Sequence, residues 1–216
     1  MGCCKETRPT MDTGFIETFA PSPLDMEGRH GYVTFPRSRA MWCAENKDTA
    51  NCGRISHEPQ SVEAQKGFPL TGGKIPPDGK LASGGIDRFS QLDAIKAPNG
   101  HDWPREPVTP GAIYKAEWYL TAEHRTSKWE YWITRDGWDP TKPLSREQLE
   151  PEPFMVFNWP HPDGFWTAHK PTKGVAHWVQ MPKNKRGYHV IYAVWEVADT
   201  DNSFYQACDV EFTAAS

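Results

Sequence analysis

The stretch GYHVIYAVWEVADTDNSFYQACDVEFT, residues 187–213, holds two runs that are rich in aromatic and β-branched residues. Such residues pack well on the pleated surface of a sheet, whereas the Asp and Asn residues between the runs favour turns. The stretch therefore predicts two β-strands, over residues 187–198 and 203–213. Three runs of the same kind occur earlier in the chain and indicate the fold to which these strands belong.

The three earlier runs cover residues 112–122, 128–134 and 175–181. Gly, Pro, Asp and Asn bound them, as is typical of strands that are joined by turns. Their number and close spacing predict an all-β fold, an antiparallel β-sandwich. A capping-box pattern at Ser145 and Gln148 predicts at most one short helix in this part of the chain.

Residues 30 to about 110 form a different region, rich in Gly, Pro and polar residues, with only brief hydrophobic runs. A region of this length is too long for an ordinary loop, so we expect it to carry small structure of its own or a function. Cys43 and Cys52 lie nine residues apart in it and can close a disulfide loop if the protein is exported. Cys208, on the apolar face of the last predicted strand, is expected to be a buried free thiol.

The first 29 residues lack both the apolar core and the A-x-A cleavage site of a signal peptide. We expect residues 1–29 to be a disordered N-terminal extension, whose origin is a leader, a pro-segment or an artefact of the start site. Cys3 and Cys4 within it show no metal-binding spacing. The rest of the chain, residues 30–216, is long enough for a single domain with one sizeable core.

The composition excludes several classes of function. A formal net charge of −4 with interspersed signs gives no basic surface for nucleic acid, and no apolar run approaches the roughly 20 residues that span a bilayer. The motifs of nucleotide-binding loops, serine hydrolases and zinc proteases are also absent. We therefore expect no nucleic-acid partner and no membrane partner. Ten Trp, ten Phe and seven Tyr residues suit either an aromatic core or stacking on sugar rings.

Six ordered segments of the chain point to a known family. They are HGYVTFPRSRAMWC (30–43), HEPQSVEAQKGFP (57–69), DGKLASGG (78–85), LTAEHRTSKWEYWIT (120–134), GWDPTKPLSREQL (137–149) and residues 187–210. Together they resemble the bacterial-type, chitin-active lytic polysaccharide monooxygenases, the chitin-binding proteins of auxiliary activity family ten. The resemblance covers His30 to about Phe212. It implies an immunoglobulin-like or fibronectin-III-like β-sandwich with a large loop region, roughly residues 40–110, between the first strands.

The resemblance implies a histidine brace. In this family one copper ion is bound by the α-amine and ring of an N-terminal histidine and by the ring of a second histidine. By resemblance these are His30 and His124. Imidazole and amine nitrogens suit copper in both of its oxidation states. An amide nitrogen within a chain cannot replace the amine, so His30 would have to become the first residue.

Further residues around the copper are implied in the same way. Phe204 would keep one face of the ion closed, Ala122 would leave limited room beside it, and Glu63 would position an oxygen-derived ligand or pass a proton. Trp195 would be a buried aromatic residue within electron-transfer reach. Without the neighbouring segments, the three apolar residues would be ordinary core and Glu63 a solvated loop carboxylate.

A flat surface for a crystalline polymer is implied around the copper. Many chitin-active relatives carry a Tyr or Trp that stacks on a sugar ring at the position of His57, whose smaller imidazole offers less stacking area. On spacing alone, Glu58 and Glu63 are also compatible with the acid and base of a hydrolase, or with plain surface carboxylates. The implied substrate-binding residues are His57, Glu58, Thr121, His124, Asp199 and Asn202.

The activity implied by the resemblance is oxidative cleavage of crystalline chitin at C1, which leaves a lactone and then an aldonic acid. It needs one copper ion per chain, an external electron donor, and O2 or H2O2 as co-substrate. We expect a secreted, monomeric protein that acts on insoluble chitin, with cellulose as the alternative substrate. A non-catalytic chitin-binding module and a secreted effector that targets chitin-lined tissue are the alternative functions.

Overall fold

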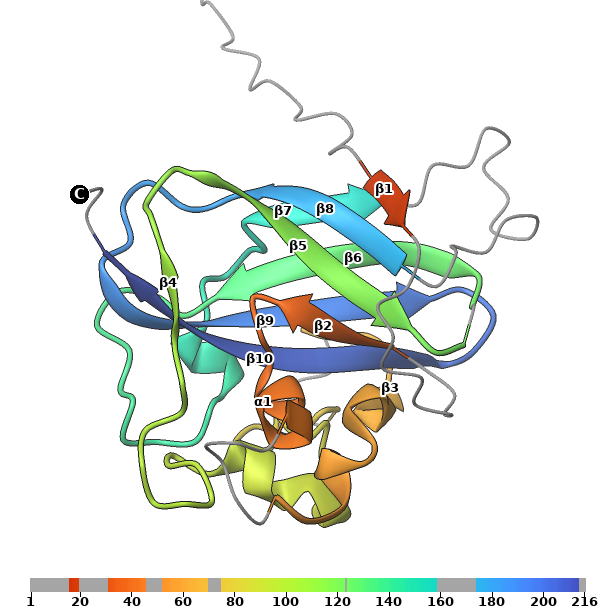
Figure 1. The fold of residues 1–216 in the computed structure, drawn as a ribbon, viewed down its shortest axis with the longest axis horizontal. Helices are drawn as coiled ribbons and strands as arrows, with labels where there is room; N and C mark the ends of the chain where they lie inside the picture. Colours follow the sequence, from red (N-terminus) through yellow and green to blue (C-terminus); the bar gives the residue numbers. More distant parts are fainter. Residues whose placement is uncertain are drawn as a thin grey trace, which may run out of the picture.

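The computed structural model describes residues 16–19, 31–45, 52–69, 75–122, 124–158 and 174–213, with only the backbone at 16–19 and 174. Two β-sheets pack face to face, and a set of short helices covers the outer face of one of them (Figure 1). This arrangement confirms the predicted antiparallel β-sandwich.

The sheets of the described part have four and six strands. The four-stranded sheet has the order β1 (Ile16–Phe19), β8 (Gly174–Gln180), β5 (Ile113–Leu120) and β2 (Gly31–Phe35). The six-stranded sheet runs through β3 (Glu63–Gln65), β10 (Asn202–Phe212), β9 (Gly187–Val197), β6 (Thr126–Ile133) and β7 (Met155–Asn158), and β4 (Glu106–Val108) pairs with β10. The pairing of β4 with β10 is parallel, and the pairings of the other strands are antiparallel.

All five strands that the sequence predicts are present. β5, β6, β8, β9 and β10 begin and end within two residues of the predicted ranges. The capping box at Ser145 and Gln148 is also present, and it opens the short 3-10 helix η4 (Arg146–Gln148). The patterns of residue type along the chain therefore located the long strands correctly.

The predicted loop region between β2 and β5 carries structure of its own. Its buried apolar side chains, among them Leu81 and Phe89, form a second core against the outer face of β9 and β10. The predicted disulfide between Cys43 and Cys52 is present and ties the first helix to the second. The helical elements of the region are α1 (Arg39–Glu45), η1 (Gly53–Ser56), η2 (Pro59–Ser61) and η3 (Asp87–Asp93).

β9 and β10 are buried on both faces. On β10, Phe204 and Cys208 face the core between the sheets, whereas Tyr205 and Ala207 face the second core under the loop region. A strand that is buried on both faces has a nearly continuous hydrophobic sequence, as residues 187–198 do. Cys208 is a buried free thiol, as predicted.

Part of the expected N-terminal extension forms a strand. Ile16–Phe19 pair with residues 174–177 and extend the four-stranded sheet at the edge of β8. At these four positions the structure shows a strand where the sequence led us to expect disorder. The rest of residues 1–29, with Cys3 and Cys4, lies outside the described residues, and the domain boundary before His30 stays a prediction. Within the described part of the chain, no helix has the length and apolar character needed to cross a membrane.

A buried ion pair joins the loop region to β10. The guanidinium of Arg39 in α1 donates two hydrogen bonds to the carboxylate of Asp209, at 2.8 and 2.9 Å, and a third to the carbonyl oxygen of Leu92 at 2.8 Å. Arg39 is 6% exposed and Asp209 is 0% exposed. The hydroxyl of Tyr188 also donates to Asp209, at 2.5 Å. The hydrogen bonds compensate both charges for the loss of water, which is the condition for a buried ion pair to be stable.

His177 on β8 is held in the core between the sheets by other rings. It stacks on Phe157 with ring centroids 4.5 Å apart and lies 4.7 Å from the ring of Trp129. Trp118 Nε1 donates to the hydroxyl of Tyr131 at 2.9 Å, and this hydroxyl is hydrogen-bonded to His177 Nδ1 at 2.8 Å. Burial lowers the pKa of His177 from its ordinary 6.5 to about 3. The ring is therefore neutral near pH 7.

Removing one partner of the Arg39–Asp209 pair should unfold the protein more readily. In Arg39→Met a carboxylate stays buried without its counter-charge, so we expect the free energy of unfolding to fall by about 3–5 kcal/mol. The double variant Arg39→Met/Asp209→Leu should lose less than the single one. The control is Arg37→Met, since Arg37 pairs with Glu106 near the surface and should cost at most about 1 kcal/mol. Chemical denaturation measures all three variants, and equal losses at positions 37 and 39 would contradict the prediction.

His177 should make the protein less stable in acid. Its pKa is lower in the folded state, so the unfolded chain takes up a proton below pH 6.5 that the folded chain does not accept until about pH 3. The free energy of unfolding therefore decreases as the pH falls through this range. In His177→Phe the decrease between pH 7 and pH 5 should be about 2 kcal/mol smaller than in the wild type.

Urea unfolding at the two pH values tests this expectation. His101→Phe, at an exposed position, is the matched control and should respond as the wild type does. A wild-type response in His177→Phe would show that the core does not hold this ring neutral.

Candidate functional site

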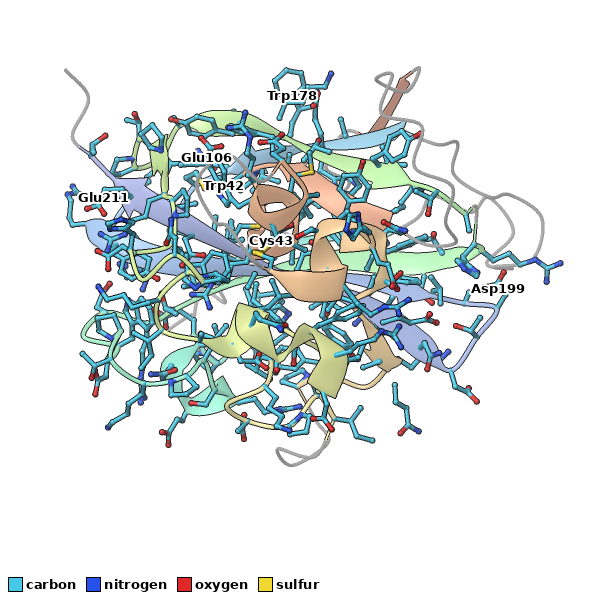
Figure 2. The ribbon with its side chains drawn as sticks, turned by 60° about the horizontal axis from the view of Figure 1, so that its bottom comes forward. Trp42, Cys43, Glu106, Trp178, Asp199 and Glu211 are labelled. Atoms are coloured by element: carbon cyan, nitrogen blue, oxygen red, sulfur yellow. A yellow bond between two sulfur atoms is a disulfide. The ribbon has the colours of Figure 1, made fainter. Side chains whose placement is uncertain are left out.

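His124 lies between β5 and β6, at the end of the sandwich where β9 turns into β10. Its Nδ1 donates a hydrogen bond to Oδ1 of Asp199, in that turn, at 3.1 Å, and Asp199 Oδ2 accepts another from the backbone nitrogen of Arg125 at 3.1 Å. Figure 2 shows Asp199 at this end of the strand pair. The carboxylate fixes the orientation of the imidazole, and a neutral ring that donates from Nδ1 carries its lone pair on Nε2.

Two buried aromatic side chains pack beside His124. Phe204 on β10 lies opposite Trp195 on β9, and the two rings stack with centroids 4.8 Å apart. The ring of His124 lies 5.9 Å from that of Trp195 and 6.0 Å from that of Phe204. Trp195 Nε1 donates to Thr126 Oγ1 at 2.8 Å, which satisfies the polar atom of the indole and fixes it in place. The imidazole therefore rests on a rigid apolar wall.

Strand pairing brings Glu63 next to Phe204, beside His124. β3 pairs with β10 so that Glu63 lies opposite Phe204. Residues that lie opposite each other in antiparallel strands project from the same face of the sheet. Asn202 projects from this face too, and its Nδ2 donates to Glu63 Oε1 at 2.8 Å. The carboxylate is therefore held on the side of the sheet that carries Phe204 and His124.

Gly31, the first residue of β2, packs closely on Trp195. A Cβ atom at this position would lie 2.7 Å from Leu120 Cδ2 and 2.9 Å from Trp195 Cζ3, so no larger residue fits without displacing its neighbours. Gly31 is also opposite Leu120 in the pairing of β2 with β5. The start of β2 is thus fixed against the ring that contacts His124. His30 itself lies outside the described residues.

Thr121 and Ala122 follow β5 directly and are half-buried. They connect Leu120, which contacts Gly31, to the segment that holds His124. They therefore lie at the same end of the sandwich as His124, where the resemblance places them. Their roles beside a metal or a substrate stay predictions.

His57 and Glu58 lie at the end of η1, in the loop region. His57 is exposed, whereas Glu58 is engaged by two arginines, Arg54 at 2.9 Å and Arg88 at 3.7 Å. Glu58 is thus paired with cationic side chains, whereas Glu63 accepts a hydrogen bond from Asn202. A role for His57 and Glu58 in substrate binding stays a prediction.

Two residues that contact Trp195 beside His124, namely Gly31 and Thr126, were not predicted from the sequence. Gly31 carries a signal that could have found it, since it is a glycine directly after the predicted ligand His30. Thr126 carries none, because its role depends on the indole of Trp195, 69 residues away in the chain.

Comparison with known proteins identifies the family. The family model described as "Lytic polysaccharide mono-oxygenase, cellulose-degrading" matches residues 30–210. The lytic chitin monooxygenase of Enterococcus faecalis is 40% identical over 183 residues, which are 84% of this chain and 84% of that protein. GlcNAc-binding protein A of Shewanella oneidensis is 42% identical over 187 residues, which are 87% of this chain but 36% of that protein. The chain thus spans about a third of the length of the latter.

Solved structures agree with the family match. An AA10 lytic polysaccharide monooxygenase from Streptomyces lividans has a TM-score of 0.77 and 39% identity, covering 85% of this chain and 100% of that one. The CBM33 protein of Bacillus amyloliquefaciens in complex with Cu(I) has a TM-score of 0.69 and 36% identity, with coverage of 85% and 100%. The chain therefore belongs to the lytic polysaccharide monooxygenases of auxiliary activity family ten, a family of oxidoreductases.

Proposed function

We propose that the chain is a copper-dependent monooxygenase that cleaves crystalline chitin at C1 of its β-1,4 linkages, once His30 has become its first residue. One copper ion would be held by the α-amine and ring of His30 and by the ring of His124. The observation that carries this proposal is the packing of Gly31 on Trp195, whose ring contacts that of His124. One peptide bond joins Gly31 to His30. This packing therefore supports the proposal that His30 and His124 bind the same copper ion.

The donor set fits copper. Imidazole and amine nitrogens bind this metal in both oxidation states, and Asp199 orients His124 so that Nε2 would be the nitrogen that binds the ion. No group of three or more His, Cys, Asp or Glu side chains among the described residues could hold a metal ion, so an ion at His124 needs ligands from elsewhere, which His30 would provide. The relative whose structure contains Cu(I) supports the same metal. Bound copper would supply the one-electron and oxygen chemistry that protein side chains lack.

The surrounding residues would orient the site and handle a proton. The stacked rings of Phe204 and Trp195 exclude water from one side of the His124 imidazole. Glu63 is held by Asn202 on the same face of the sheet, where its carboxylate would hold or pass a proton. Ala122, as a small residue after β5, would leave room beside the ion for the oxygen co-substrate.

The end of the sandwich around His124 would bind the polymer, through Thr121, Asp199 and Asn202 with His57 and Glu58 from the loop region. The names of the relatives, lytic chitin monooxygenase and GlcNAc-binding protein A, support chitin as the substrate. The description of the family model favours cellulose as a second candidate. An external electron donor and O2 or H2O2 would complete the reaction. The disulfide supports a secreted protein, which we propose acts as a monomer.

The first test is mass spectrometry of the soluble products from β-chitin incubated with copper and ascorbate. Protein that begins at His30 should release aldonic-acid oligosaccharides, whereas the full chain should not, because its His30 has no α-amine. His124→Ala in the trimmed protein should abolish the products, and His101→Ala at an exposed position should not. Parallel incubations with cellulose decide between the two substrates.

Other outcomes of this test have definite meanings. Products from the full chain as well would show that the amine of His30 is not needed. If neither form gives products while both still bind chitin, the monooxygenase proposal fails and a chitin-binding module takes its place.

The close packing at Gly31 gives a second test. In trimmed Gly31→Ala, the added methyl group must displace Trp195 or Leu120, so the start of β2 shifts relative to His124. We expect copper to bind at least about tenfold more weakly, as is typical when the support of a metal ligand is lost. Thr34→Ala, in the same strand, is the control and should bind copper as the wild type does. Isothermal titration calorimetry with Cu(II) measures the affinity of both variants. Unchanged affinity in Gly31→Ala would contradict a copper site formed by His30 and His124 together.

A further inference from the structure

A hollow of about 490 Å³ lies between the connection from β6 to η4 and the start of β9. A smaller hollow of about 240 Å³ adjoins it, since both are lined by Pro140 and Tyr188. The volume of the larger one lies within the range of about 300–1,000 Å³ that is usual for ligand sites. We call it the Tyr188 hollow, and the residues that matter below are Asp136, Trp138, Pro140, Asn184, Arg186 and Tyr188.

The Tyr188 hollow lies far from the candidate copper site. Tyr188 is the second residue of β9, and Trp195 is seven residues further along the same strand. At roughly 3.3 Å per residue this is a distance of about 23 Å. Glu211, which is opposite Tyr188 on β10, and Asp199 mark the two ends of this strand pair in Figure 2. A ligand in the hollow would therefore bind at the other end of the sandwich from His124.

Aromatic rings form one wall of the hollow and are fixed in position. Trp138 packs edge-on against Tyr188, with centroids 5.0 Å apart at 63°, and its Nε1 donates to the carbonyl oxygen of Tyr188 at 2.9 Å. The guanidinium of Arg105 lies 3.7 Å from the centre of the Tyr188 ring. Trp138 is half-buried, so part of its surface still faces solvent beside the exposed ring of Pro140. Rigid rings of this kind bind the apolar face of a ligand with little loss of entropy.

The charged groups around the rings already have partners within the protein. Asp136 pairs with the buried Lys185 at 3.0 Å, and Arg186 donates from Nη1 to the carbonyl oxygens of Lys183 at 3.0 Å and Lys185 at 2.7 Å. Both signs of charge line the hollow, so an anion or a cation would meet repulsion as well as attraction. An apolar ligand would cover these polar groups without replacing their contacts with water.

A neutral ring with many hydroxyl groups avoids the repulsion that an anion or a cation would meet. It also replaces the contacts with water that an apolar ligand would remove. Its hydroxyls can donate to Asp136, accept from Arg186, and do both with the amide of Asn184. Its C–H face can lie on Trp138 or Pro140. We infer that the Tyr188 hollow is a second binding site for a neutral β-linked oligosaccharide, separate from the surface around His124. Such a site would hold the protein on a glycan chain without occupying the oxidising end.

Nuclear magnetic resonance on the 15N-labelled full chain, treated with chelator, tests this inference. The probes are the β-1,4-linked tetramers of N-acetylglucosamine and of glucose, a choice that rests on the proposed function. The indole signal of Trp138, assigned by its absence in Trp138→Phe, should shift with at least one tetramer and reach saturation. The indole of Trp178, which is 41% exposed on β8 and projects away from the sandwich in Figure 2, should not shift.

Variants show whether the shift belongs to the hollow. Asn184→Ala changes an exposed side chain and should weaken binding at least threefold with an unchanged melting temperature. Trp138→Ala has no indole at this position, so its titration is followed by the backbone amide signal of Gly137, which also lines the hollow, and binding should weaken at least tenfold. Asn158→Ala, at an exposed position on β7, should bind as the wild type does. Absence of a Trp138 shift with both tetramers, or equal affinity in Asn184→Ala and the wild type, would overturn the inference.

His124→Ala separates this inference from the proposed function. It removes a proposed copper ligand and should leave the titration of the Trp138 indole unchanged. If His124→Ala loses the shift, the signal reports the candidate copper site and the second site does not exist. If β-chitin yields no oxidised products but the titration is saturable, only the proposed function fails.

Discussion

β9 and β10 are buried on both faces, and the other parts of the molecule are arranged to satisfy this constraint. One face forms the core between the sheets, while the other needs a cover, which the loop region provides with its own apolar core. The Arg39–Asp209 pair fixes this cover to β10. The same two strands carry Trp195 and Phe204, so β9 and β10 support both the loop region and the candidate site. A change that loosens the loop region will therefore also move the wall behind His124.

The long strands could be predicted from the sequence because their signal is local. A run of eight to eleven residues such as β5 or β9 shows its composition and its bounding turn residues directly. Short elements give no such signal. β3 has three residues and exists because β10 offers it a pairing edge, with Glu63 opposite Phe204. The disulfide between Cys43 and Cys52 was predictable because both cysteines lie in one short segment.

The residues of the candidate site were predicted by resemblance, whereas their relations to one another required the fold. Asn202 and Glu63 are 139 residues apart, and Asp199 and His124 are 75 residues apart, yet each pair is joined by a hydrogen bond. No periodicity in the chain indicates these contacts, because they arise where separate strands end at the same edge of the sandwich. The ion pair of Glu58 with Arg88 depends on how the short helices of the loop region pack, whereas its pair with Arg54 is local, at i and i+4.

Cys208 lies in the same core as Trp195 and Phe204. Burial raises the pKa of its thiol well above the ordinary value, and the thiolate is the form of cysteine that reacts with oxidants and disulfides. The folded protein thus keeps this sulfur inert, even in a medium that contains peroxide. Cys208 is 0% exposed, so a thiol reagent can reach it only when the core around it opens. The rate at which a thiol reagent labels Cys208 therefore measures how often the core that supports the candidate site opens.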